Sequence, residues 1–177
     1  MIVAMCRSGG IGLRNNLPFH LRSVDKCFHE TTIGRGNNAV IMGRKTAMQF
    51  PSLPKRDSLI LSNSKNVENS FNTLFDIKEF CHDKKYDNVW IIGGEKVFQT
   101  CINDKDLQSI FVIDLQADFL CNKHFPPIPF NFYLREKGPC IKDNNIKFRV
   151  LNYAKKTSSL ITTVPPNFHF SWDFLQK

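Results

Sequence analysis

Residues 89–98 read VWIIGGEKVF, and the expected fold depends on this stretch. Four apolar residues lead into a glycine pair, and a polar, helix-compatible segment follows. A short unbroken apolar run that ends at a turn signal is typical of a strand buried on both faces. In the next segment, helical spacing gathers an apolar face from Val97, Phe98, Cys101 and Ile102. The stretch predicts a strand, a tight glycine turn and a helix.

The turn at Gly93–Gly94 has two interpretations. Two glycines let a ligand approach the backbone, and the start of the helix offers free N–H groups to an anion. The other interpretation is an ordinary strand-to-helix turn. The stretch alone favours the ordinary turn, because the full G-x-G-x-x-G phosphate signature is missing.

Composition indicates a globular protein of one domain. The chain has 177 residues, of which 42% are hydrophobic, and it contains no apolar run of the roughly 18 residues that a membrane span needs. The N-terminus does not resemble a secretory signal. Six cysteines without a C-x-x-C pair argue against a metal cluster and predict reduced thiols. We therefore expect a cytoplasmic protein, with access to the nucleus left open.

The net charge of +8 comes mostly from lysines in loops. No basic helix or aromatic-basic alternation accompanies it, so we expect no nucleic-acid partner and no membrane. A solvated surface or small phosphorylated ligands fit this charge better.

Strand and helix patterns alternate in the first part of the chain. Strands are expected at 2–6, 39–42, 58–62 and 89–92, and helices at 21–30, from 44, from 73 and at 95–102. Residues 73–76 resemble a capping box, and residues 8–20 are too rich in Gly, Asn and Pro for regular structure. After residue 106 only strands follow, at 108–119, 131–135 and 146–153. This order predicts an α/β fold with a mainly parallel sheet and an antiparallel C-terminal edge.

The end of the chain has a different character. Residues 164–177 contain a double proline at 165–166, which is followed by a run rich in aromatic side chains. We expect a domain over residues 1–155 and a C-terminal extension over 156–177. The tail at 164–177 is a candidate contact surface for a protein partner, because Trp and Phe anchors are common hot spots; packing on its own domain is the alternative.

Several short motifs, in order, are similar to those of dihydrofolate reductase. The motifs are IG at 11–12, NLP at 16–18, VIMGRKT at 40–46, LPKR at 53–56, ILS at 60–62, IIGG at 91–94 and HFP at 124–126. Each is weak alone, but their order and spacing match that family over about residues 2–154. The resemblance implies eight strands, mostly parallel, with flanking helices, and a protein that binds NADPH and a folate.

The resemblance also implies site residues. Those expected to bind NADPH are Ala4, Ile11, Gly12, Gly43, Arg44, Lys45, Thr46, Ser62, Gly93, Gly94, Glu95, Lys96, Val97 and Phe98, with Ser62 at the 2′-phosphate. Those expected around dihydrofolate or a folate-like molecule are Ile2, Val3, Val24, Phe28, Phe50, Leu53, Arg56 and Ile113, with Arg56 pairing with the α-carboxylate.

The sequence departs from the family at the acid of the pterin pocket. The family has an Asp or Glu on its first helix, which binds the pterin and helps to deliver a proton. Alignment on Leu21 and Phe28 puts Val24 at that position, whereas Asp25 would face about 100° away. A rival alignment from Pro18 puts Asp25 in the site and requires a deletion within the helix. We prefer Val24, because length changes sit more easily in loops.

Ile113 is a second departure, where the family usually has Thr. Valine with isoleucine would leave the polar edge of the pterin without partners, at about 1–3 kcal/mol for each unsatisfied group. The main hypothesis is therefore a dihydrofolate reductase homologue that binds NADPH but has weak or absent reductase activity, with repurposing for protein contacts as part of the same hypothesis. The alternative is an active NADPH-dependent reductase that produces tetrahydrofolate, with Asp25 as the acid. A third hypothesis is a related reductase that acts on another pterin or pyrimidine.

Overall fold

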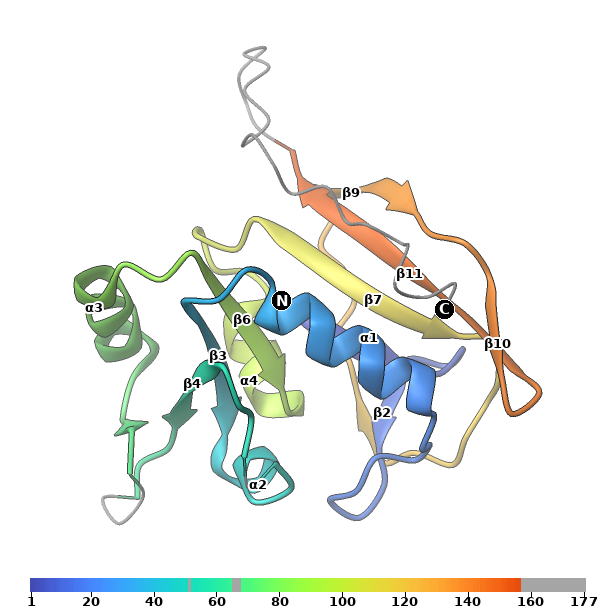
Figure 1. Ribbon diagram of the computed structural model, residues 1–177, viewed down its shortest axis with the longest axis horizontal. Helices are drawn as coiled ribbons and strands as arrows, with labels where there is room; N and C mark the ends of the chain where they lie inside the picture. Colours follow the sequence, from blue (N-terminus) through green and yellow to red (C-terminus); the bar gives the residue numbers. More distant parts are fainter. Residues whose placement is uncertain (51, 65–67, 157–177) are drawn as a thin grey trace.

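The computed structural model describes residues 1–50, 52–64 and 68–156 (Figure 1). Its helices are α1 (Arg22–Ile33), α2 (Arg44–Ala47), α3 (Leu74–Lys84) and α4 (Glu95–Cys101). Its strands are β1 (Ile2–Met5), β2 (Gly10–Gly12), β3 (Asn38–Gly43), β4 (Arg56–Leu61), β5 (Ser70–Phe71), β6 (Asn88–Gly93), β7 (Ser109–Leu115), β8 (Lys123–His124), β9 (Phe132–Lys137), β10 (Ile141–Asp143) and β11 (Ile146–Lys155). The expected tail at 164–177 lies outside the described residues.

Parallel strands form the part of the sheet that precedes residue 116. Strands β5, β4, β3 and β6 lie in that order and are all parallel, and β1 pairs in parallel with β7. Contacts between β1 and β6 place these two groups side by side. The C-terminal edge is antiparallel, since β11 pairs with β7, β9 and β10 in that sense. The mixed α/β architecture is confirmed, with its strands divided more finely than the expected eight.

The loop expected over residues 8–20 contains a strand that the sequence did not indicate. Strand β2 pairs antiparallel with β8, with Gly10 opposite His124 and Gly12 opposite Lys123. Both strands are very short. They form because the chain after β7 passes beside the first loop, where β8 can pair with β2. The pairing fixes the position of the first loop relative to the loop before β8.

The stretch from β6 into α4 folds as expected. Trp90 and Ile91 are 5% and 9% exposed and belong to different hydrophobic clusters, so this part of β6 is covered on both faces. The face expected for α4 is buried at Val97, Phe98, Cys101 and Ile102. The capping box is also present, because Thr73 Oγ1 accepts from the Asp76 N–H and Asp76 Oδ2 accepts from the Thr73 N–H, each at 3.1 Å.

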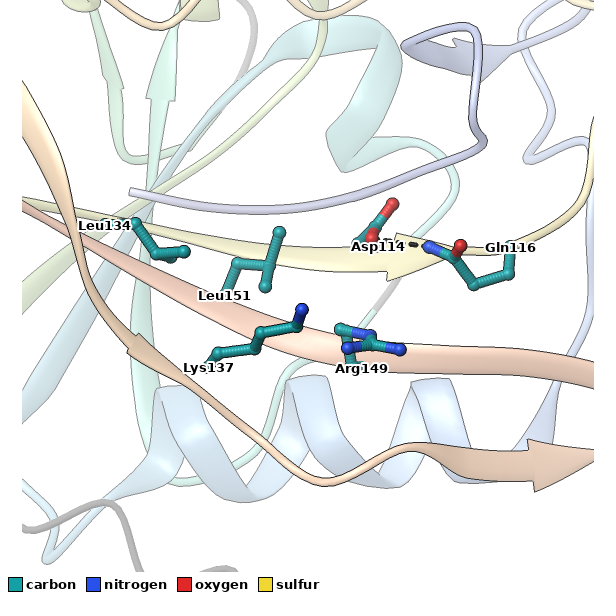
Figure 2. Close-up of a pocket in the computed structure, with 6 residues that line it drawn as sticks. All are labelled: Asp114, Gln116, Leu134, Lys137, Arg149 and Leu151. Carbon is teal, nitrogen blue, oxygen red and sulfur yellow. Dashed lines mark hydrogen bonds between the residues drawn. The ribbon is translucent and has the colours of Figure 1, made fainter.

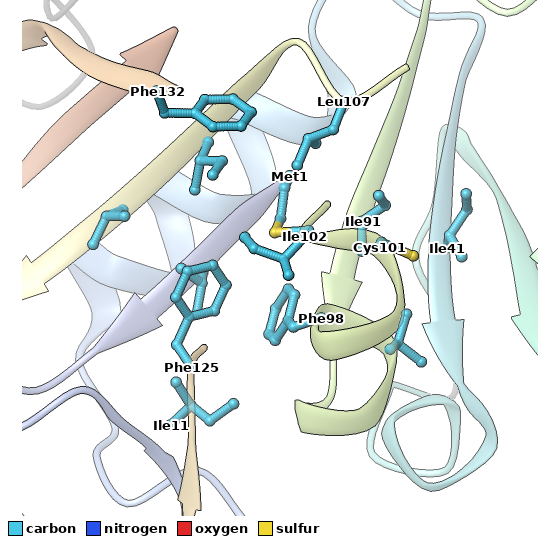
Figure 3. Packing of buried hydrophobic residues seen from close by; sticks show 14 of the residues in the cluster. Met1, Ile11, Ile41, Ile91, Phe98, Cys101, Ile102, Leu107, Phe125 and Phe132 are labelled. Carbon is cyan, nitrogen blue, oxygen red and sulfur yellow. The ribbon is translucent and has the colours of Figure 1, made fainter. Parts of the chain in front are cut away.

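Two hydrophobic clusters cover the two faces of the sheet. The α4-side core joins α3 and α4 to the sheet and is shown in Figure 3; its members include Ile11, Ile41, Ile91, Phe98, Cys101 and Phe125. The α1-side core joins α1 to the sheet; its members include Ile2, Leu21, Val24, Trp90, Phe111 and Ile113. No helix among the described residues is long and apolar enough to cross a membrane.

Candidate functional site

The glycine turn after β6 lies against the turn after β3. Strands β3 and β6 are parallel neighbours with Met42 opposite Gly93, so their carboxyl ends and the helices that follow are brought together. A methyl group added at Gly94 would lie 3.2 Å from Thr46 Oγ1, and one added at Gly43 would lie 3.2 Å from Val97 Cγ2. These two motifs, separated by about 50 residues, form one surface.

The backbone at the turn requires glycine. Gly93 has φ 111°, and its peptide bond to Gly94 is cis. A methyl group at Gly93 would lie 2.8 Å from the Phe98 ring, which is buried in the α4-side core. The turn therefore has room for a ligand's approach to the backbone but not for a side chain.

Cationic and hydroxyl groups lie at the carboxyl ends of β3 and β4, on the same edge of the sheet as this turn. Arg44 and Lys45 are exposed and Thr46 is partly buried at the start of α2. Ser62 follows β4, the neighbour of β3, and its Oγ accepts from the Ser64 N–H at 3.1 Å. Two cations beside hydroxyls and free N–H groups suit a phosphate.

Strand β8 connects the first loop, residues 8–20, to the start of α4, because β8 pairs with β2 and contacts Glu95. Glu95 Oε1 accepts from the His124 N–H at 2.9 Å, and Glu95 Oε2 pairs with Lys123 Nζ at 3.0 Å. These hydrogen bonds and the Lys123 charge hold the pKa of Glu95 below its usual value. Because β8 pairs with β2, Ile11 and Gly12 lie on the same side of the fold as the glycine turn. Lys96 is exposed and makes no such link among the contacts described.

Val24 is buried and Asp25 is exposed. Val24 is 4% exposed and packs in the α1-side core together with Ile2 and Ile113, which is completely buried. Ala4, opposite Ile113 in the β1–β7 register, packs against the same cluster. The structure thus brings together the two positions at which the sequence departs from the family resemblance.

Asp25 lies at the side of α1, near charged groups. Partial burial raises the pKa of Asp25, while His20 and His29 lower it and Asp143 raises it. Asp143 itself caps α1 from a distant hairpin, since its Oδ2 accepts from the Ser23 N–H at 2.9 Å. None of these three neighbours belongs to the α1-side core.

Val3 does not join the other residues expected around a folate. Its side chain belongs to the α4-side core, on the opposite face of β1 from Ile2. This follows from the two-residue period of a strand, which sends neighbouring side chains to opposite faces. Only the backbone of Val3 is near the remaining expected residues.

Packed apolar side chains connect α1 with Arg56. The rings of Phe28 and Phe50 stack with centroids 5.9 Å apart, and Leu53 is buried beside them. The Arg56 guanidinium lies 6.0 Å from the Phe28 centroid. A hollow of about 340 Å³ lies next to Leu53 and Arg56 and is also lined by Asn37, Asn38, Pro54, Lys55, Asp57 and Tyr86.

Two partners of Arg56 were not predicted from the sequence. Arg56 donates to Thr32 Oγ1, and its Nη2 lies 3.0 Å from His29 Nδ1. Its Nε donates to the Pro54 carbonyl at 3.3 Å. The sequence feature that could have indicated these partners is the three-residue spacing of His29 and Thr32, which puts both side chains on one face of α1.

A second hollow lies away from all the expected site residues. Figure 2 shows its six lining residues, which come from β7, β9 and β11 and the residue after β7, and its volume is about 250 Å³. Gln116 Nε2 donates to Asp114 Oδ2 at 2.6 Å, and burial raises the pKa of Asp114. Asp114 and Ile113 are consecutive in β7 and face opposite sides of the sheet, so this hollow is separate from the α1-side core.

Comparison with known proteins gives a consistent family. A family model described as dihydrofolate reductase matches residues 1–155. The dihydrofolate reductase of Drosophila melanogaster is 31% identical over 170 residues, covering 84% of this chain and 92% of that protein. The dihydrofolate reductase of Bos taurus is 31% identical over 178 residues, covering 87% and 95%. A bifunctional dihydrofolate reductase-thymidylate synthase of Glycine max is 24% identical over 187 residues, covering 94% of this chain and 35% of that protein.

Proposed function

Because the chain belongs to the dihydrofolate reductase family, we propose that it binds NADPH and a folate-like molecule but reduces dihydrofolate weakly or not at all. The observation that carries the proposal is the burial of Val24 beside Ile113 in one apolar cluster, with Asp25 exposed. A proton donor must lie within hydrogen-bond reach of the atom that it protonates, directly or through one water. Val24 and Ile113 have no group that can donate.

The described residues fit NADPH at the glycine turn. The missing side chains of Gly43 and Gly94 each leave a small space. A methyl group added at either glycine would lie 3.2 Å from the nearest side-chain atom of the other motif. Arg44, Lys45, Thr46 and Ser62 would hold phosphates there, and Ile11 and Gly12 would border the nicotinamide. When bound, NADPH supplies a hydride. The residues of the chain orient the ligands and exclude water, but the α1-side core provides no acid.

Arg56 supports binding of a folate-like molecule rather than its reduction. The guanidinium is held by the Thr32 hydroxyl and the Pro54 carbonyl, beside the Phe28 ring. An arginine fixed in this way suits a carboxylate. A pterin bound beside Val24 and Ile113 would find no acidic partner there for its amino-pyrimidine edge.

The second candidate function is an active reductase in which Asp25 supplies the proton. Partial burial raises the pKa of Asp25, which favours its holding a proton. An acid in this place would act through water, at a reduced rate, because its side chain is exposed.

One assay separates the two candidates: NADPH oxidation with dihydrofolate at several pH values, for wild type, Val24→Asp, Asp25→Asn and the control Asp87→Asn. We expect slow wild-type turnover, little change in Asp25→Asn, and at least about a tenfold gain in Val24→Asp, which is a fraction of the about 10²–10⁴-fold that a well-placed acid contributes. Brisk wild-type turnover that Asp25→Asn abolishes and Asp87→Asn preserves would establish the second candidate.

The extension over residues 156–177 is proposed to be separate from the domain over residues 1–155 and to serve a protein partner. The family model ends at residue 155, which supports this division. A chain that ends at Lys156 should bind NADPH with unchanged affinity by calorimetry. Loss of soluble, folded protein on this truncation would show instead that the extension belongs to the core.

A further inference from the structure

Cys6 and Cys121 are far apart in the sequence and meet beside the first loop. Cys6 follows β1, and Cys121 lies just before β8. Both are free thiols. The chain between Cys6 and Gly10 is a tight turn, in which the Cys6 N–H donates to the Gly10 carbonyl at 3.0 Å and the Gly9 N–H donates to the Cys6 carbonyl at 2.8 Å.

Gly10 leaves the space in which the two thiols approach each other. A methyl group added at Gly10 would lie 2.6 Å from Cys121 Cβ and 3.0 Å from Cys6 Sγ, and it would also collide with Cys121 Sγ. Both sulfurs therefore lie within 3.0 Å of one point and are neighbours. Any residue larger than glycine at this position would push Cys121 away from Cys6.

The two thiols differ in acidity and exposure. Burial raises the pKa of Cys6, but hydrogen bonds with the Ser8 hydroxyl and with the backbone of Phe119, Gly10 and Ser8 outweigh it, so the net shift is downward. Burial, followed by the charge and hydrogen bond of Cys6, raises the pKa of Cys121. Cys6 is 1% exposed, whereas Cys121 is partly exposed. Exposure makes Cys121 the thiol that a peroxide can reach, and the lowered pKa of Cys6 favours the thiolate that would then attack the oxidised Cys121.

We propose that Cys6 and Cys121 form a redox-modification site, in which a peroxide converts the two neighbouring thiols into a reversible disulfide. The Cys121 sulfur attacks one peroxide oxygen, the O–O bond breaks, and Cys121 becomes a sulfenic acid as one water leaves. The Cys6 thiolate then attacks the Cys121 sulfur, the S–O bond breaks, and the hydroxide leaves as a second water with the proton of the Cys6 thiol. In sum, two thiols and one hydrogen peroxide give one disulfide and two waters.

The disulfide would link the turn before β2 to the loop before β8, the strand that pairs with β2. Strand β2 carries Ile11 and Gly12, and the Asn122 N–H, next to Cys121, donates to the Gly12 carbonyl at 2.9 Å. The cross-link would hold the first loop against the loop before β8. Under the proposed function, the cross-link slows the exchange of NADPH. That effect rests on the proposed function, whereas the formation of the cross-link does not.

The test is peptide mapping of the full chain after treatment with hydrogen peroxide, with free thiols then blocked by an alkylating reagent. Cleavage after Lys and Arg places Cys6 in residues 1–7 and Cys121 in residues 106–123. We expect a joined species of these two peptides, two hydrogen atoms lighter than their sum, with two of the six thiols lost and recovered by dithiothreitol. Cys140, which is an exposed free thiol, should remain alkylated at the same peroxide dose.

Three variants make the test specific. Cys6→Ser and Cys121→Ser should each abolish the joined species. Gly10→Ala should lower its yield severalfold, because the added methyl group separates the sulfurs. The proposal is overturned if Cys140 is oxidised while Cys6 and Cys121 stay alkylated, or if oxidation stops at sulfinic acid on Cys121 in the wild type. Because the readout is mass and uses no cofactor, a negative result here leaves the proposed function standing, and the reverse also holds.

Discussion

Replacement of Val24 by aspartate should cost stability in a pH-dependent way. Val24 is 4% exposed, so the change gives up most of the burial of a valine side chain, worth about 1.5–3 kcal/mol. A protonated carboxyl without a hydrogen-bond partner costs a further ~1–3 kcal/mol. We expect the free energy of unfolding of Val24→Asp to fall by about 3–5 kcal/mol, a large part of the ~5–15 kcal/mol typical of a domain.

The sign of the pH dependence follows from the burial. An acid in the α1-side core would have a folded-state pKa above its unfolded value of about 3.9. Above the unfolded value, the folded state would hold more protons than the unfolded state. The free energy of unfolding should therefore fall as the pH rises from about 4 through the folded-state pKa.

Urea unfolding followed by circular dichroism at about pH 5 and pH 8 measures both effects. The matched control is Val24→Thr, which has nearly the same shape but does not titrate, and its loss should not grow with pH. Asp25→Asn, at the exposed neighbour, should stay within about 0.5 kcal/mol of wild type. If Val24→Asp is as stable as wild type and Asp25→Asn is strongly destabilised, then α1 is rotated by one residue and the reasoning about the pocket is wrong.

Three other substitutions test the capping box, the glycine turn and the arginine. Thr73→Ala should lower the free energy of unfolding by about 1 kcal/mol, whereas Thr100→Ala, an exposed threonine of α4, should lower it by less than about 0.5 kcal/mol; equal losses would contradict the cap. Gly94→Ala should weaken NADPH binding about tenfold by calorimetry, and unchanged affinity would place the cofactor elsewhere. Arg56→Lys should weaken folate binding about 10–100-fold through loss of a fixed guanidinium, while the exposed control Arg135→Lys should leave it unchanged.

The elements that the sequence predicted best are those whose local signals agree. At residues 89–102 the apolar run, the glycine pair and the helical spacing all indicate one structure. At residues 73–76 the capping box indicates the start of α3. In both places the contacts that decide the structure lie within a few residues, so the chain can be interpreted without knowing its tertiary partners.

The end of α1 shows how tertiary contacts change a local expectation. The helix was expected to end near residue 30 but continues to Ile33, and Gly34 with φ 54° ends it. Thr31 and Thr32 are buried, and their hydroxyls donate to the Cys27 and Phe28 carbonyls within the helix. Their poor helix propensity is outweighed by this burial.

The sequence indicated which residues to expect at the candidate site, but it did not indicate their contacts with one another. The resemblance indicated Arg56 and Val24, but the contact of Arg56 with Thr32 depends on how α1 lies against β4. The pairing of β2 with β8 escaped prediction because each strand is too short to show a period. The choice between Val24 and Asp25 was limited by an alignment across a loop of uncertain length, and the burial of Val24 in the structure supports the alignment on Leu21 and Phe28.

At position 24, a valine favours the stability of the fold, whereas an acid would favour the reduction of dihydrofolate. A buried acid costs free energy that a valine of similar size does not, because a charged or unpaired polar group loses its water. The proposed cofactor site should depend little on this position, since Ile11, Val97 and Phe98, which support the first loop and the glycine turn, belong to the opposite α4-side core. A chain with valine here can therefore keep a stable fold and an NADPH site while losing its acid. It follows that Val24→Asp should lose stability and gain turnover together, with NADPH affinity unchanged; a variant that lost NADPH affinity as well would show that the two halves are coupled.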